Sequence, residues 1–177
     1  ALAELVRRDA ALKLYGADGS LWTDDAALAA EISAWLGWVP VIDEMRVKAQ
    51  VLETWGEEAL RSGERVVLCG MGGSSLAPLV FQRVFGGPLV VLDTTDPDAV
   101  RAVPVEGSRF VISSKSGGTV EPNVMLEHFW AATGGDGRRF VAITDHGSKL
   151  QETAASRGFA RAFLNRSDIG GRFSALS

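Results

Sequence analysis

The sequence predicts a doubly wound α/β domain with a five-stranded parallel sheet, preceded by an N-terminal helical segment. After residue 64, short apolar runs rich in β-branched residues alternate with helical stretches and glycine turns. The runs are almost continuously apolar, which is typical of strands buried on both faces of a parallel sheet. Before Gly63 the apolar spacing is helical only. We therefore divide the chain into a helical segment, 1–63, that packs on the core, and an α/β domain, 64–177.

The α/β domain has five candidate strands, which contain runs such as VVL, LVVL, FVI and FVAI. They are Arg65–Cys69, Pro88–Leu92, Arg109–Ser113, Arg139–Ile143 and Arg161–Leu164. Two of the intervening helices have clear start signals. Pro97 lies just inside a helix capped by Asp96, and Ser148 forms a capping box with Gln151.

The N-terminal segment contains two or three predicted helices. Residues 2–14 place several leucines and a valine near one face, and Thr23 is the expected N-cap of a second helix that reaches Leu36. A third helix runs from about Val41 to Leu60 and is closed by Gly63.

Composition narrows the class of protein. The length of 177 residues fits one domain, and the net charge of −4 gives no electrostatic footprint for nucleic acid. No apolar run is long enough to cross a membrane. The single cysteine, Cys69, cannot form an internal disulfide, so we expect a reducing, cytoplasmic location. Two isolated histidines without cysteine partners do not make a metal site, and we expect neither a metal nor a cofactor.

In open α/β sheets, ligands bind beyond the carboxyl ends of the strands, so the turns found there carry the functional signal. The first strand is followed by Gly70-Met71-Gly72-Gly73-Ser74-Ser75. Its glycines allow a close approach of the backbone to an anion, and amides at the start of the next helix point toward that anion. The alternative interpretation is a plain tight turn between a strand and a helix.

The turn after the third strand is richer in donors. Ser114, Ser116 and Thr119 offer hydroxyls, Lys115 offers a positive charge, and Gly117 and Gly118 leave the backbone open; together they predict a phosphate cradle. The alternative is a solvated polar loop in which Thr119 is only an N-cap.

The fifth strand is followed by Gly170-Gly171-Arg172, where an arginine could reach a bound anion. The alternative is a surface arginine in a salt bridge.

A dinucleotide site at the first turn is a further alternative, because Gly70-x-Gly72-x-x-Ser75 follows a strand and Asp93 lies about 20 residues on. The third glycine of that fingerprint is replaced by Ser75, and the chain has no Walker sequence.

Four segments together resemble the glucose-6-phosphate isomerase family. They are GMGGSSLAP at 70–78, SSKSGGTVEP at 113–122, ITDHGSKL at 143–150 and IGGRFSALS at 169–177. Their spelling is most similar to the isomerase half of bacterial transaldolase/phosphoglucose-isomerase fusion proteins. The resemblance implies a flavodoxin-like sugar-isomerase (SIS) domain.

The resemblance also implies roles for single residues. Gly72, Gly73 and Ser74 would form a phosphosugar-binding turn, and the residues from Ser114 to Thr119 would bind the phosphate. Gly171 would line the site, Arg172 would stabilise an enediolate intermediate, and Glu121 would support a catalytic histidine. His146 stands where the family commonly has proline, a departure that we do not interpret.

By resemblance, the activity is interconversion of glucose 6-phosphate and fructose 6-phosphate through a cis-enediolate, a step of glycolysis and gluconeogenesis. We expect this chain to be the N-terminal phosphosugar-binding part of a longer protein, inactive alone, because the family's base comes from a second SIS domain. The expected partners are that second domain, the sugar phosphate and possible homodimer contacts, without nucleic acid or membrane. A non-catalytic, regulatory SIS module that binds sugar phosphates and a nucleotide-binding domain are the alternatives.

Overall fold

The computed structural model describes residues 2–170 of the chain. These residues form two units: one extends to Gln50 and includes the segment that starts at Asp168, and the other is Val51–Ser167. The first unit contains four short elements, and the long helix α4 continues from it into the second. The elements are α1 (Leu2–Arg7), α2 (Ala10–Tyr15), the 3₁₀ turn η1 (Gly19–Leu21), α3 (Ala26–Ser33) and α4 (Val41–Arg61).

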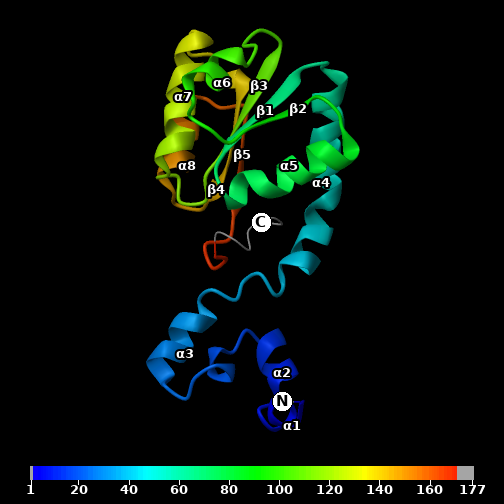
Figure 1. The fold of residues 1–177 in the computed structure, drawn as a ribbon, viewed down its shortest axis with the longest axis vertical. Coiled ribbons are helices and arrows are strands. Elements are labelled where there is room, and N and C mark those ends of the chain that lie inside the picture. Colours follow the sequence, from blue (N-terminus) through cyan, green and yellow to red (C-terminus); the bar gives the residue numbers. More distant parts are fainter. Residues whose placement is uncertain (1, 171–177) are drawn as a thin grey trace. The chain divides into compact units, whose positions relative to one another are not determined.

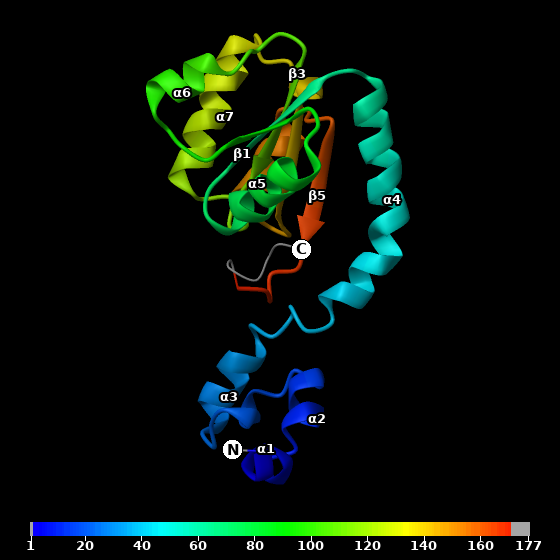
Figure 2. The same cartoon turned by 45° about the vertical axis from the view of Figure 1, so that its right-hand side comes forward.

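The second unit contains the predicted α/β sheet and the helices between its strands, drawn in green to orange in Figures 1 and 2. It begins at Val51 and ends at Ser167, whereas the sequence divided the chain after residue 63. Its sheet is formed by five strands, β1 (Arg65–Gly70), β2 (Leu89–Leu92), β3 (Ser108–Ser113), β4 (Phe140–Asp145) and β5 (Arg161–Asn165). The helices between them are α5 (Gly73–Phe85), α6 (Pro97–Ala102), α7 (Val120–Ala132) and α8 (Lys149–Ser156), with a 3₁₀ turn η2 (Gly137–Arg139) before β4.

All strand pairs in this sheet are parallel, and the strand order is β2-β1-β3-β4-β5. This is the flavodoxin-like order, in which the chain changes direction across the sheet between β1 and β3. The fold class predicted from the sequence is therefore confirmed. Each predicted strand is present, with ends that differ from the prediction by no more than two residues.

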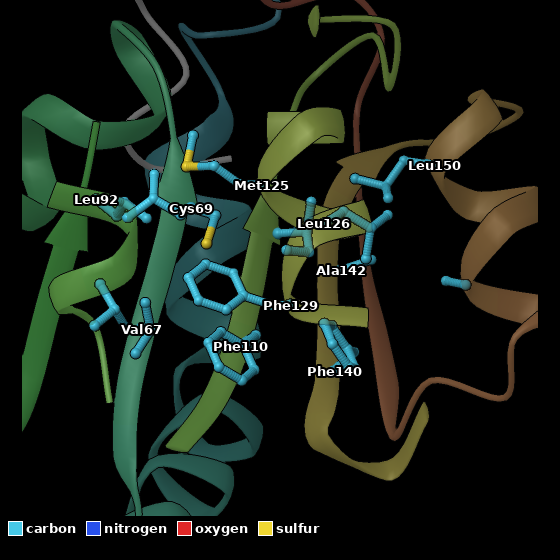
Figure 3. Packing of buried hydrophobic residues seen from close by; sticks show 14 residues of the cluster. Val67, Cys69, Leu92, Phe110, Met125, Leu126, Phe129, Phe140, Ala142 and Leu150 are labelled. Carbon is cyan, nitrogen blue, oxygen red and sulfur yellow. The ribbon is translucent and has the colours of Figure 1, made fainter. Parts of the chain in front are cut away.

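One face of the sheet carries the larger hydrophobic core, which α6, α7 and α8 cover (Figure 3). Phe110 of β3 stacks on Phe129 of α7 at 4.3 Å between ring centroids and on Phe140 of β4 at 5.4 Å. Cys69 is fully buried here, as the sequence predicts, and burial raises the pKa of its thiol to about 12. The thiol therefore stays protonated and acts as a small apolar side chain.

The other face of the sheet is covered in part by α4. Leu68, Val111 and Val141 form the core of this layer. Trp55 of α4 packs edge-on against Phe163 of β5, with ring centroids 5.2 Å apart. Helix α5 lies against β1 and β2, and the Gln82 side chain donates a hydrogen bond to the carbonyl of Leu89.

The N-terminal helices differ from the prediction in two details. The region 2–14 is not one helix, because Asp9 adopts a left-handed conformation, with φ of 50°, between α1 and α2. The N-cap of α3 is Asp25 rather than Thr23. The Asp25 carboxylate accepts hydrogen bonds from two helix amides, whereas the Thr23 hydroxyl accepts one from Asp25 itself. A carboxylate interacts more favourably than a hydroxyl with the positive end of a helix, which explains the shift.

Among the helices of the part of the chain that the structure describes, none is long and apolar enough to span a bilayer.

Candidate functional site

The turns that follow β1 and β3 lie next to each other at the carboxyl edge of the sheet. Gly70, the last residue of β1, pairs with Ser113, the last residue of β3. A Cβ atom on Gly70 would lie 3.1 Å from the Ser74 Cβ and 3.4 Å from the Ser113 carbonyl oxygen. Glycine therefore allows the first turn to fold closely over the end of the neighbouring strand.

The turn after β1 leads directly into α5. Gly72 is its N-cap residue and has a φ of 56°, a conformation that L side chains rarely adopt. The buried Ser75 hydroxyl donates to the Gly72 carbonyl at 3.1 Å, and this hydrogen bond stabilises the turn. Gly73 and Ser74 are half-buried and form the start of the helix. No side chain accepts a capping hydrogen bond from the first amides of α5, so that demand is left to other groups.

The loop after β3 brings two of the predicted phosphate ligands together. Ser114 is buried, its amide donates to the Ile143 carbonyl at 3.0 Å, and its hydroxyl lies 3.1 Å from the Thr119 hydroxyl. Thr119 is the N-cap residue of α7, yet its side chain makes no capping hydrogen bond. The hydroxyl that would normally satisfy a helix amide is thus turned toward Ser114.

The remainder of this loop is held by its own contacts. The exposed Ser116 accepts a hydrogen bond from the amide of Gly118 at 3.2 Å. Gly117 has a φ of 68°, and a Cβ there would lie only 2.5 Å from the Leu150 amide nitrogen of α8. Gly117 is therefore required by the packing of the loop on α8 as well as by its backbone conformation.

Asn123 is a loop-supporting residue that the sequence analysis missed. From the first turn of α7, its side-chain amide donates to the carbonyl of Gly117 at 3.1 Å and to that of Thr119 at 2.7 Å. The available signal was its position four residues after Thr119, where a helical side chain faces back toward the N-cap. The two bonds tie the loop after β3 to the first turn of α7.

Lys115 points to the neighbouring turn. Its ammonium group forms an ion pair with the Asp145 carboxylate at the end of β4 and donates to the Ser167 carbonyl at 3.2 Å. The Lys115 carbonyl in turn accepts hydrogen bonds from the Asp145 amide at 3.0 Å and the Thr144 hydroxyl at 3.2 Å. Asp145 was also missed in the sequence, where its place at the end of the fourth strand was the available signal.

The other predicted residues are more scattered. Glu121 is the second residue of α7, two positions after Thr119, and is half-buried. His146 is exposed, and its amide donates to the Asn165 carbonyl at 3.4 Å. Gly171 and Arg172 lie outside the described residues.

The arrangement as a whole is suited to an anion. Two helix N-termini without side-chain caps, α5 and α7, begin at adjacent turns, and the hydroxyls of Ser114 and Thr119 lie beside the second. Backbone amides at helix starts bind phosphate groups well, because the helix dipole favours negative charge there. Within residues 2–170, no group of three or more His, Cys, Asp or Glu side chains is placed to hold a metal ion.

Comparison with known sequences relates the chain to one group of enzymes. It is 34% identical to the glucose-6-phosphate isomerase of Campylobacter jejuni over 128 residues, which are 64% of this chain and 31% of that enzyme. The glucose-6-phosphate isomerase of Chlamydia trachomatis serovar A is 30% identical over 164 residues, 79% of this chain and 31% of the enzyme. No family model matches the chain.

Solved structures give the same relationship. A hypothetical protein of Thermus thermophilus superposes with a TM-score of 0.70 and 26% identity, covering 99% of this chain and 43% of that one. A glucose-6-phosphate isomerase from Chlamydia trachomatis superposes with a TM-score of 0.63 and 27% identity, covering 92% and 32%. The chain is therefore related to glucose-6-phosphate isomerases, shares their α/β fold, and spans about a third of their length.

Proposed function

We propose that this chain is the phosphosugar-binding SIS part of a glucose-6-phosphate isomerase. One observation carries the proposal: α5 and α7, both without side-chain caps, begin at adjacent turns on either side of the point where the strand order reverses. Ligands of flavodoxin-like sheets bind at this place. The relationship to glucose-6-phosphate isomerases supports a sugar phosphate as the anion.

In this proposal the chain binds and orients the substrate by its phosphate. The amides at the start of α7, with the hydroxyls of Ser114 and Thr119, hold the phosphate, and Gly72, Gly73 and Ser74 complete the wall of the site. Binding energy from this remote group is used to place the reacting carbon atoms, C1 and C2, for proton transfer.

The chemical step needs two further groups. A base moves a proton between C1 and C2, and a fixed cation stabilises the enediolate oxygens that develop charge on the way. Arg172 is the proposed cation, and Glu121 is proposed to support a histidine that handles the proton on the sugar ring. We place the base in a part of the enzyme that this chain does not include.

The test is a pair of measurements on two proteins. The natural gene product that contains this chain should isomerise glucose 6-phosphate in an assay coupled to fructose 6-phosphate consumption. Residues 1–177 alone should bind sugar phosphate weakly and show no turnover above that of a Glu121→Gln control. Turnover by the 177-residue protein would contradict the placement of the base, and an inactive gene product would contradict the isomerase assignment.

A binding-only, regulatory SIS module is the second candidate. It needs only the anion donors at the uncapped starts of α5 and α7, and it needs no base. The two candidates separate on the gene product: a regulatory module binds sugar phosphate and does not isomerise it, whereas an isomerase does both.

A further inference from the structure

Lys115 is the single lysine of the candidate phosphate loop, and its charge is directed toward the end of β4. The ammonium group pairs with Asp145, and the two side chains are only 22% and 11% exposed. It also donates to the Ser167 carbonyl, beyond the end of β5. One side chain from the loop after β3 thus contacts the last residue of β4 and the segment that follows β5.

We propose that Lys115 is a positioning residue of this site, which fixes the loop after β3 through its ion pair with Asp145 instead of contacting the phosphate. This inference rests on the proposed function and assigns a role to one residue of that site. Lys115 acts on the ligand through the loop that it holds. The charge that a direct phosphate ligand would supply is already neutralised by Asp145.

The local contacts explain why the loop depends on this pair. The Asp145 Oδ1 atom is buried and has no hydrogen-bond partner among the described residues, so Lys115 is the group that neutralises the carboxylate. When one member of a poorly exposed ion pair is removed, the other is left as an uncompensated charge away from water. When both are replaced by neutral groups of similar shape, that penalty disappears.

The backbone bonds make the coupling to the phosphate loop direct. The Asp145 backbone amide and the Thr144 hydroxyl both donate to the Lys115 carbonyl, so the end of β4 holds the main chain of the residue just after Ser114. The Thr144 hydroxyl also lies 2.7 Å from the hydroxyl of Ser148, the N-cap of α8. A displaced Asp145 would therefore move the loop that carries Ser114 and Ser116.

The experiment compares Lys115→Met, Asp145→Asn and the double variant Lys115→Met/Asp145→Asn with the unaltered protein. Titration with inorganic phosphate and with fructose 6-phosphate gives the affinity, and amide NMR shifts of residues 114–119 report the loop. Urea unfolding and circular dichroism identify the temperature at which every variant is folded. The matched control is Arg101→Met/Asp98→Asn, which removes an ion pair from the exposed surface of α6.

A positioning role predicts that each single variant weakens phosphate binding about 10-fold to 100-fold, the range seen for residues that orient the direct ligands of a metal. Both single variants should shift the loop amides, and the double variant should recover the shifts and an affinity within about threefold of the unaltered protein. A direct contact between Lys115 and phosphate predicts another pattern. Asp145→Asn would then keep or strengthen binding, and the double variant would bind as weakly as Lys115→Met.

That second pattern would overturn the inference, and so would single variants that lose stability but bind phosphate normally when folded. Failure of the unaltered protein to bind either ligand would contradict the proposed function instead. In that case the amide NMR shifts of residues 114–119 decide the positioning role. Shifts that change in both single variants and return to those of the unaltered protein in the double variant support it. Shifts that stay unchanged in the single variants overturn it.

Discussion

The four helices that follow strands of the sheet begin in two different ways. After β2 and β4, a side chain caps the helix: Asp96 accepts hydrogen bonds from two amides of α6, and Ser148 accepts one from α8. After β1 and β3, the N-cap residues Gly72 and Thr119 make no such bond. All four turns lie at the same edge of the sheet, so the difference comes from the residues placed there.

This difference indicates which turns are structural and which are available to a ligand. A capped helix has satisfied part of the demand of its first amides internally, whereas an uncapped helix leaves that demand to water or to a bound group. The two uncapped helices are also the two that flank the reversal of strand order between β1 and β3. The missing side-chain caps and the strand order therefore point to the same two turns, those after β1 and β3.

The segment after β5, where the sequence places Arg172, extends the comparison and should give the largest effect. In the complete protein, the proposed role of Arg172 predicts that Arg172→Ala lowers kcat for the isomerisation by about 10²–10³, the range for removal of one donor to a developing oxyanion. Because that charge exists only along the reaction path, KM should change little. Arg172→Lys should recover part of the rate, since it keeps the charge and loses the planar fork. Steady-state kinetics decide: an unchanged kcat in Arg172→Ala would assign the arginine to a surface salt bridge.

Thr119→Ala tests an uncapped turn. Loss of a hydroxyl that donates to a charged group should cost roughly 1.5–3 kcal/mol of phosphate binding, or about 10-fold to 150-fold in affinity. Isothermal titration with fructose 6-phosphate measures this change. Thr153→Ala is a matched control, because the Thr153 hydroxyl donates only to a carbonyl of its own helix, that of Lys149. Equal affinity in the two variants would mean that Thr119 does not contact the phosphate.

Asp96→Ala tests a capped turn, and it should lower stability without weakening phosphate binding. The Asp96 carboxylate accepts from the amides of Asp98 and Ala99, both at 3.0 Å. Its loss should lower the free energy of unfolding by about 1 kcal/mol, the usual cost of removing an N-cap. Phosphate affinity should not change. Urea unfolding with and without fructose 6-phosphate separates the two effects, and loss of binding in Asp96→Ala would remove the distinction between capped and uncapped turns.

Much of the α/β fold could be predicted from the sequence because its strands are buried on both faces. A run such as that of β3 is then apolar throughout and differs clearly from the helices beside it. The caps Asp96 and Ser148 were also correctly predicted, since each acts within three residues of its own position. The predicted capping box differs in one bond, because the Gln151 side chain accepts from the amide of Gly147 and not from that of Ser148. The N-terminal helices were predicted less well. Nothing in the local pattern announces the left-handed Asp9 that separates α1 from α2.

The candidate site was only partly visible in the sequence. The glycines and hydroxyls of the two turns marked it, but their partners come from elsewhere in the chain. Asp145 lies 30 residues after Lys115, and only the pairing of β3 with β4 brings the two together. Sequence reasoning counted Lys115 by its charge alone, and the structure adds the group that neutralises that charge.

An amide NMR titration of the 177-residue protein with fructose 6-phosphate locates the phosphate site directly. We predict the largest shift changes at the uncapped starts of α5 and α7, in residues 72–75 and 116–121. The capped starts of α6 and α8, in residues 96–99 and 148–151, should change little. Changes centred on the capped helices, or equal changes at all four, would contradict the claim that the turns after β1 and β3 form the phosphate site.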